Sequence, residues 1–181
     1  SERLVSALHQ KAVPAAVNFT QAAGPALQGV SQSIAKGALG DLVGVDIVLT
    51  YSAWPRAWQV AADWLRFRAE GGMTREVLSH FLFFSERILG PLEIDFAAPS
   101  YPEDPLLCET ALLARLHSSR GHPVNILASV GGAQPDRQEL TVKGTLKSRR
   151  ISDFYIDAVS DGGEFKELCE RPSDPRAASL K

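Results

Sequence analysis

The apolar pattern of this sequence changes near residue 92, and the change limits the folds that the chain can adopt. Before that point, apolar side chains recur at helical spacing in three segments: residues 2–11, 25–38 and 74–89. Two strand-like runs lie among them: residues 13–19 and 41–53. Beyond it, short turn segments separate five strand-like runs: residues 92–97, 108–117, 124–130, 139–146 and 151–159. Helices followed by hairpin-linked strands predict an α+β domain, with a mostly antiparallel, open β-sheet that carries helices on one face.

The length of the chain fits a single domain. At 181 residues, it can bury roughly 70% of the surface that its unfolded form exposes, which is enough for a hydrophobic core. We expect an N-terminal helix over residues 1–12 and the α+β domain over residues 13–163. We expect a loosely held tail over residues 164–181, since that segment is polar and contains prolines.

Charge and composition argue against several functions. The net charge of −2 leaves no basic surface for nucleic acid or anionic lipid, and no apolar run approaches the ~20 residues of a membrane span. Cys108 and Cys169 are not part of a Cys-x-x-Cys pair, so we expect reduced thiols in a cytoplasmic protein. His117 and His122 lack a carboxylate or a second cysteine at ligand spacing, and no metal site is expected. The chain also has no Gly-x-Gly-x-x-Gly or Walker sequence, so it lacks a complete nucleotide-binding turn.

Helix 74–89 carries the main candidates for catalysis. Glu76 and His80 lie four residues apart, so they project from the same face of a helix. A carboxylate beside an imidazole orients it and raises its basicity, as a general base near neutral pH requires. The alternative is a simple ion pair beside the apolar stripe of this helix, which is formed by Val77, Phe81, Phe84 and Ile88. Gly71 and Gly72 favour the first interpretation, because two glycines would let a substrate approach the N-terminus of the helix.

Tryptophans and arginines are concentrated between strand 41–53 and that helix: Trp54, Arg56, Trp58, Trp64, Arg66 and Arg68. Indoles and guanidinium groups can wall a site for a sugar-like or anionic ligand, and on this basis Trp54, Arg56 and Trp64 are candidate substrate-binding residues. Tryptophans that follow a strand also pack in cores and interfaces, which is the alternative interpretation.

Three segments also match a known pattern, in the same order along the chain: residues 17–19 with Pro25 and the helix exit 34–40, residues 70–80, and strand 140–145 with its Gly-Thr ending. Together they span roughly residues 12–150. In these segments the chain resembles the C-terminal domain of the Gfo/Idh/MocA family of NAD(P)-dependent oxidoreductases, which includes glucose–fructose oxidoreductase and inositol dehydrogenase.

The resemblance implies an enzyme of two domains. NAD or NADP would be bound by an N-terminal Rossmann domain that is absent from this chain and that carries a lysine in a Glu-Lys-Pro segment. We therefore expect no cofactor to bind this chain alone. His80 falls on the family's histidine, the proposed base that accepts the proton of the substrate hydroxyl while hydride leaves for the nicotinamide. The partners implied are a small-molecule substrate and further copies of the protein, in contact through the open sheet face.

Four positions depart from the family pattern: Glu76 stands in place of the usual Asp, Glu70 in place of the first glycine of a triplet, Gln21 in place of an arginine, and Phe83 where an acidic residue is common. These departures indicate a substrate other than a simple polyol. They also leave open a non-catalytic module of the same family that senses a ligand or assembles with a partner. A self-sufficient α+β ligand-binding domain is a third possibility.

Overall fold

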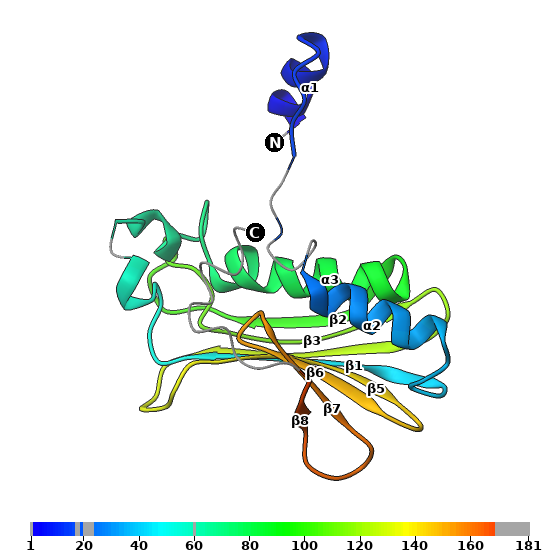
Figure 1. Cartoon of the computed structure of the whole chain (residues 1–181). Helices are drawn as coiled ribbons and strands as arrows, with labels where there is room; N and C mark the ends of the chain where they lie inside the picture. The colour runs from blue at the N-terminus through cyan, green and yellow to red at the C-terminus, as the bar shows by residue number, and fades with distance from the viewer. Residues whose placement is uncertain (1, 17–18, 20–23, 60, 169–181) are drawn as a thin grey trace.

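The computed structural model describes residues 2–16, 19, 24–59 and 61–168, and these form an open, eight-stranded sheet with helices on one face (Figure 1). From edge to edge the strands are β2 (Leu92–Ser100), β3 (Ala111–Ser118), β4 (Pro123–Val130), β1 (Leu42–Tyr51), β5 (Arg137–Gly144), β6 (Ser148–Ser152), β7 (Ile156–Ser160) and β8 (Lys166–Glu167). β1 and β4 are parallel, and every other neighbouring pair is antiparallel. The predicted α+β fold is confirmed.

Strand β1 organises the hydrophobic core. Its side chains alternate, so that Val45, Ile47, Leu49 and Tyr51 are buried in the core while the residues between them face the open side of the sheet. β4 and β5 pair with its two edges, and their buried residues extend the same apolar layer.

Two helices, α2 (Pro25–Ala35) and α3 (Ser79–Leu89), cover that layer (Figure 1). α3 continues from a π-helical turn, η3 (Thr74–Leu78). The predicted apolar stripe is confirmed, because Val77, Phe81 and Phe84 are all buried in the core. Gly90 ends α3 in the left-handed region, with a φ of 86°, which favours glycine at the end of a helix.

The predicted strand 151–159 is wrong, because the segment contains two strands. β6 and β7 are joined by a tight turn in which Asp153 and Phe154 have φ angles of 47° and 67°. The apolar pattern continues through the turn because Phe154 packs against Phe81 of α3, so the sequence shows no polar break there.

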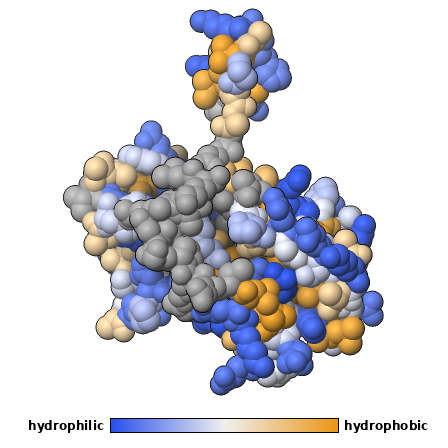
Figure 2. All heavy atoms as spheres, in the orientation of Figure 1, coloured by the Kyte–Doolittle hydropathy of each residue, from blue (hydrophilic) through white to orange (hydrophobic). Residues whose placement is uncertain are grey.

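The N-terminal strand predicted at 13–19 is not present in the described residues. Residues 13–16 are exposed and, like Phe19, form no strand, while residues 17–18 lie outside the described part of the chain. Pro14 has no amide hydrogen to contribute to a sheet. Helix α1 (Glu2–Gln10) precedes this segment and buries no residue. It stands clear of the rest of the molecule (Figures 1 and 2).

At the C-terminal end, the segment predicted as a tail begins with β8, which pairs with β7. Residues 169–181, which include Cys169, lie outside the described residues. Gln21 also lies outside them. None of the helices that the structure describes is long and apolar enough to cross a membrane.

Two segments that carry the family resemblance meet at one end of β1. The backbone N–H of Asp41 donates a hydrogen bond to Oγ1 of Thr145 at 2.9 Å. Gly144 lies directly against the chain around Leu39, where a Cβ would overlap the carbonyl oxygen of Leu39 and lie 2.7 Å from that of Lys147. Gly144 is therefore required by close packing of the backbone.

Replacing Gly144 with alanine is expected to lower the free energy of unfolding by about 1–3 kcal/mol, because an added methyl group in a closely packed site forces the backbone to shift. Urea unfolding followed by circular dichroism measures the change. Gly163→Ala is the matched control, since a Cβ at Gly163 meets no atom within 4 Å. An equal effect of the two substitutions would contradict the packing argument.

Candidate functional site

The turn that begins helix η3–α3 is capped by a carboxylate from a distant part of the chain. Glu109 is buried and accepts hydrogen bonds from the backbone N–H of Thr74, at 2.7 Å, and from its hydroxyl, at 2.6 Å. A negative charge is favourable there, because the first N–H groups of a helix have no partner within it. The π-helical form of the turn is also notable, since such turns occur frequently at functional sites.

Gly71 and Gly72 have an explanation within the chain itself. A Cβ at Gly71 would overlap the backbone of Leu65, and one at Gly72 would lie 2.7 Å from a carboxylate oxygen of Glu109. Gly72 also has a φ of 107°, which side-chain-bearing residues rarely adopt. Glu109 thus occupies the place at the helix N-terminus that the sequence analysis reserved for a substrate. Contact of the two glycines with substrate stays a prediction.

His80 lies beyond the π-helical turn, half-buried in the first turn of α3. Burial lowers the pKa of its imidazole from the ordinary value of 6.5, and the Glu76 carboxylate raises it in part. Among the contacts of the described residues there is no hydrogen bond or ion pair between Glu76 and His80. The simple ion pair that the spacing allowed is therefore absent from the described structure. A pKa lowered from 6.5 favours the neutral imidazole at pH 7.

Aromatic rings surround the imidazole. The rings of Phe19 and Phe154 meet it edge-on, with centroids 5.5 Å and 5.9 Å away. Phe83 stacks on Phe19 at 4.5 Å. Nδ1 of His80 is buried and has no hydrogen-bond partner in the described part of the chain. This apolar surrounding accounts for the lowered pKa, because burial penalises the charged imidazolium.

Phe154 reaches His80 from a strained backbone. A φ of 67° is uncommon for a bulky side chain, and such conformations persist only where the surrounding structure holds them. The ring is held against Phe81, with centroids 5.3 Å apart, as well as against His80. The β6–β7 turn therefore forms one wall of the environment of His80.

Tyr51 connects the helix with the loop that follows β1. Its hydroxyl is buried and has no hydrogen-bond partner among the described residues. Burial raises the pKa of this hydroxyl; Arg56 lowers it, and Glu76 is one of three carboxylates that raise it, with Asp136 and Asp153. Arg56 and Glu76 thus lie within electrostatic reach of the same buried hydroxyl.

The structure brings together two of the three substrate-binding candidates in the loop. The guanidinium of Arg56 lies over Trp54 at 5.4 Å and over Trp58 at 4.7 Å. Trp54 is partly packed against the core, and its Nε1 donates to the carbonyl oxygen of Leu65 at 3.0 Å. Trp64 lies outside these stacks and is 47% exposed. The core-packing alternative therefore fits Trp54 better than the other two indoles.

Three further residues of the site were not predicted from the sequence: Tyr51, Phe154 and Glu109. Tyr51 is the last residue in the alternating apolar pattern of β1, so its burial could have been predicted from the sequence. A tyrosine at such a position places a polar hydroxyl in the core. Glu109 lies 35 positions from the helix that it caps, and no local pattern connects them. Phe154 was interpreted as part of a continuous strand.

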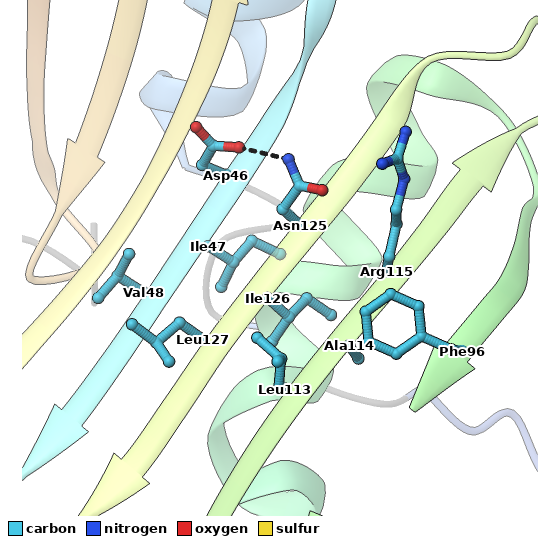
Figure 3. Close-up of a pocket in the computed structure, with 10 residues that line it drawn as sticks. All are labelled: Asp46, Ile47, Val48, Phe96, Leu113, Ala114, Arg115, Asn125, Ile126 and Leu127. Carbon is cyan, nitrogen blue, oxygen red and sulfur yellow. Dashed lines mark hydrogen bonds between the residues drawn. The ribbon is translucent and has the colours of Figure 1, made fainter. Parts of the chain in front are cut away.

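A second surface feature is a hollow of about 380 Å³ on the open face of the sheet (Figure 3). Phe96, Leu113 and Leu127 contribute its apolar lining, and Nδ2 of Asn125 donates to Asp46 at 2.9 Å beside them. This face points away from α2 and α3, and hence from His80. We place the candidate catalytic site at α3, where an acid–base group lies in an apolar environment.

The remaining histidines lie elsewhere. His117 contacts Asp95 at 2.6 Å on the sheet, and His122 lies in the turn between β3 and β4 beside Ser118. Cys108 is buried as a free thiol. No group of three or more residues suited to a metal ion occurs within the described ranges.

Comparisons with known proteins define the class of fold. The chain is similar in fold to part of two solved oxidoreductases that bind nicotinamide cofactors. The WlbA dehydrogenase of Bordetella pertussis, solved with NADH and UDP-GlcNAcA, matches 96% of the chain with a TM-score of 0.71 and 20% identity. KijD10, a 3-ketoreductase from Actinomadura kijaniata solved with NADP, matches 99% with a TM-score of 0.75 and 14% identity.

The chain spans about half the length of these two structures, 52% and 54%. No family model and no curated protein matches the sequence. The similarity is therefore one of fold, and it extends over about half of each of these enzymes.

Proposed function

We propose that this chain is the substrate-binding domain of an NAD(P)-dependent oxidoreductase of the Gfo/Idh/MocA family, and that it acts with a nucleotide-binding domain outside the chain. The observation that carries the proposal is a neutral, half-buried imidazole, His80, in a fold shared with two nicotinamide-dependent enzymes. The substrate is a small molecule that carries an alcohol or a carbonyl group. UDP-GlcNAcA and TDP-benzene, bound by WlbA and KijD10, support a small molecule as the ligand.

This chain does not fit the dinucleotide itself. A nicotinamide dinucleotide needs a glycine-rich turn that opens a helix, and the sequence has none. We therefore assign NAD or NADP to the absent Rossmann domain, where the nicotinamide would exchange hydride with the substrate carbon. The part of the reaction that belongs to this chain is the movement of the proton.

His80 performs that proton step. In alcohol oxidation, neutral His80 accepts the hydroxyl proton as the carbonyl forms, and in the reverse direction the imidazolium returns it. Nδ1 is buried, so Nε2 is the nitrogen that meets the substrate. Glu76 stabilises the imidazolium through space, as its effect on the pKa of His80 indicates. Trp54, Arg56, Trp64, Gly71 and Gly72 are proposed to line the substrate side.

The alternative is a non-catalytic module that senses a ligand or assembles with a partner. It is favoured by the absence of a hydrogen bond between Glu76 and His80 in the described structure, because an unsupported imidazole is a poorly oriented base. The sequence upstream of this chain discriminates the two. A lysine in a Glu-Lys-Pro segment after a glycine-rich loop supports the enzyme, and its absence supports the sensor.

Replacing His80 with alanine in the whole protein is expected to lower kcat by about 10²–10⁴-fold, the usual contribution of general acid–base catalysis, with a smaller change in KM. Steady-state oxidation of a turnover substrate, followed by nicotinamide absorbance, measures both constants. His122→Ala, in the β3–β4 turn, is the matched control. Unchanged kcat in the His80 variant would refute the proposed role.

We also propose that the open sheet face forms contacts between copies of the protein. Phe96, Leu113 and Leu127 expose 48%, 53% and 51% of their surfaces around the hollow. Exposed apolar surface of this kind marks an interaction site. The chemistry of this face thus supports a homo-oligomer.

A charged residue in that contact is expected to dissociate it. Leu127→Arg should convert the whole protein to a smaller species, as measured by size-exclusion chromatography with light scattering. Leu146→Arg, at an exposed position in the β5–β6 turn, should leave the mass unchanged. A wild-type protein that is monomeric at micromolar concentration would contradict the proposal.

A further inference from the structure

We infer that the loop after β1 recognises a nucleoside diphosphate group on the substrate, with Arg56 as the phosphate ligand and Trp58 as the stacking surface for the base. This inference rests on the proposed function and specifies the class of its substrate: a small molecule carried on a nucleoside diphosphate. It assigns a task to Arg56 and Trp58, which the proton step at His80 does not use.

Arg56 is held in place in a way that leaves its charge available. Its Nε donates to Oε1 of Gln59 at 3.0 Å, and its backbone N–H donates to the same oxygen at 3.1 Å. Gln59 is itself buried, so the anchor is fixed. No carboxylate forms an ion pair with Arg56 among the residues that the structure describes. The terminal nitrogens of a guanidinium fixed in this way match the oxygens of a phosphate group.

Three aromatic rings surround that guanidinium. Tyr51, Trp54 and Trp58 place their ring centroids 5.3, 5.4 and 4.7 Å from its central carbon. Tyr51 is fully buried and Trp54 partly buried, whereas Trp58 is 66% exposed. A large exposed indole beside a fixed cation is costly to leave in water, and it offers a π-face on which a nucleobase can stack. Base and diphosphate would thus be met by neighbouring side chains.

The charge of the segment favours an anion. Residues 54–75 contain four arginines and two acidic residues, in a chain whose net charge is −2. Of the two acidic residues, Asp63 is already paired with Arg66 at 3.1 Å. Arg68, which belongs to the same segment, also lies over an aromatic ring, that of Tyr101, at 4.0 Å.

The loop lies on the same side of the core as the proposed catalytic group. Arg56 and Glu76 both act on the buried hydroxyl of Tyr51, so the loop and the turn that precedes His80 are electrostatic neighbours. Nε1 of Trp54 is bonded to Leu65, whose carbonyl also accepts the N–H of Gly72 at 2.8 Å. A substrate anchored at Arg56 would therefore extend its reactive end toward α3.

Tryptophan fluorescence of the 181-residue chain tests the inference directly, because its three tryptophans all lie between residues 54 and 64. Titration with uridine diphosphate, excited where the nucleotide does not absorb, is expected to give a saturable change. Uridine alone and pyrophosphate alone should each bind more weakly. Arg56→Gln should weaken binding by about tenfold or more, the effect of losing a hydrogen-bonded charge, and Trp58→Leu should weaken it as well.

Arg120→Gln is the matched control, since Arg120 lies in the β3–β4 turn at the other end of the sheet. Circular dichroism checks that each variant is folded. No saturable signal with uridine diphosphate, or equal affinity in wild type and Arg56→Gln, would overturn the inference. Tighter, Arg56-dependent binding of NADPH would assign the site to the cofactor instead. His80→Ala should retain uridine diphosphate binding, so failure of the proton role is distinguishable from failure here.

Discussion

The hydrogen bonds from Thr74 to the carboxylate of Glu109 are the interaction on which the candidate site depends. They tie the first turn of the helix to the segment before β3, across 35 positions of sequence. Gly72 has a φ of 107° and lies against this carboxylate, so a side chain at that position would be strained. The start of the helix is thereby fixed, and with it the positions of Glu76 and His80. An anion site that would otherwise be open at this helix N-terminus is satisfied from within the chain.

The environment of His80 is then created by elements that are far apart in sequence. Phe154 comes from the β6–β7 turn and Phe19 from the segment before α2, and both meet the imidazole edge-on. Their rings remove water from the imidazole and lower its pKa, while Glu76 limits the shift. The result is an imidazole that is neutral at pH 7 and can still be protonated, which is the property that a proton acceptor in alcohol oxidation needs.

Local patterns in the sequence predicted the elements whose formation depends on neighbours along the chain. The stripe of Val77, Phe81 and Phe84 and the stop at Gly90 are examples, since helical spacing and a left-handed glycine are visible within a few residues. The contacts that make the site are of another kind. Glu109 reaches Thr74, and Phe154 reaches His80, only because the sheet brings them there. The turn at Asp153 could not be predicted from the sequence, because its second residue, Phe154, is apolar. Phe154 is apolar because it packs against α3, and a local pattern does not reveal that contact.

The pH dependence of kcat/KM for the whole protein tests the central claim, that His80 is a neutral base in an apolar environment with Glu76 as its distant counter-charge. Because burial lowers the pKa of His80 below its ordinary value of 6.5, the midpoint of the fall in oxidation activity toward acid pH should lie below 6.5. Glu76→Gln should move that fall to lower pH, since the carboxylate raises the pKa. A midpoint at or above pH 6.5, or one that Glu76→Gln leaves in place, would contradict the account.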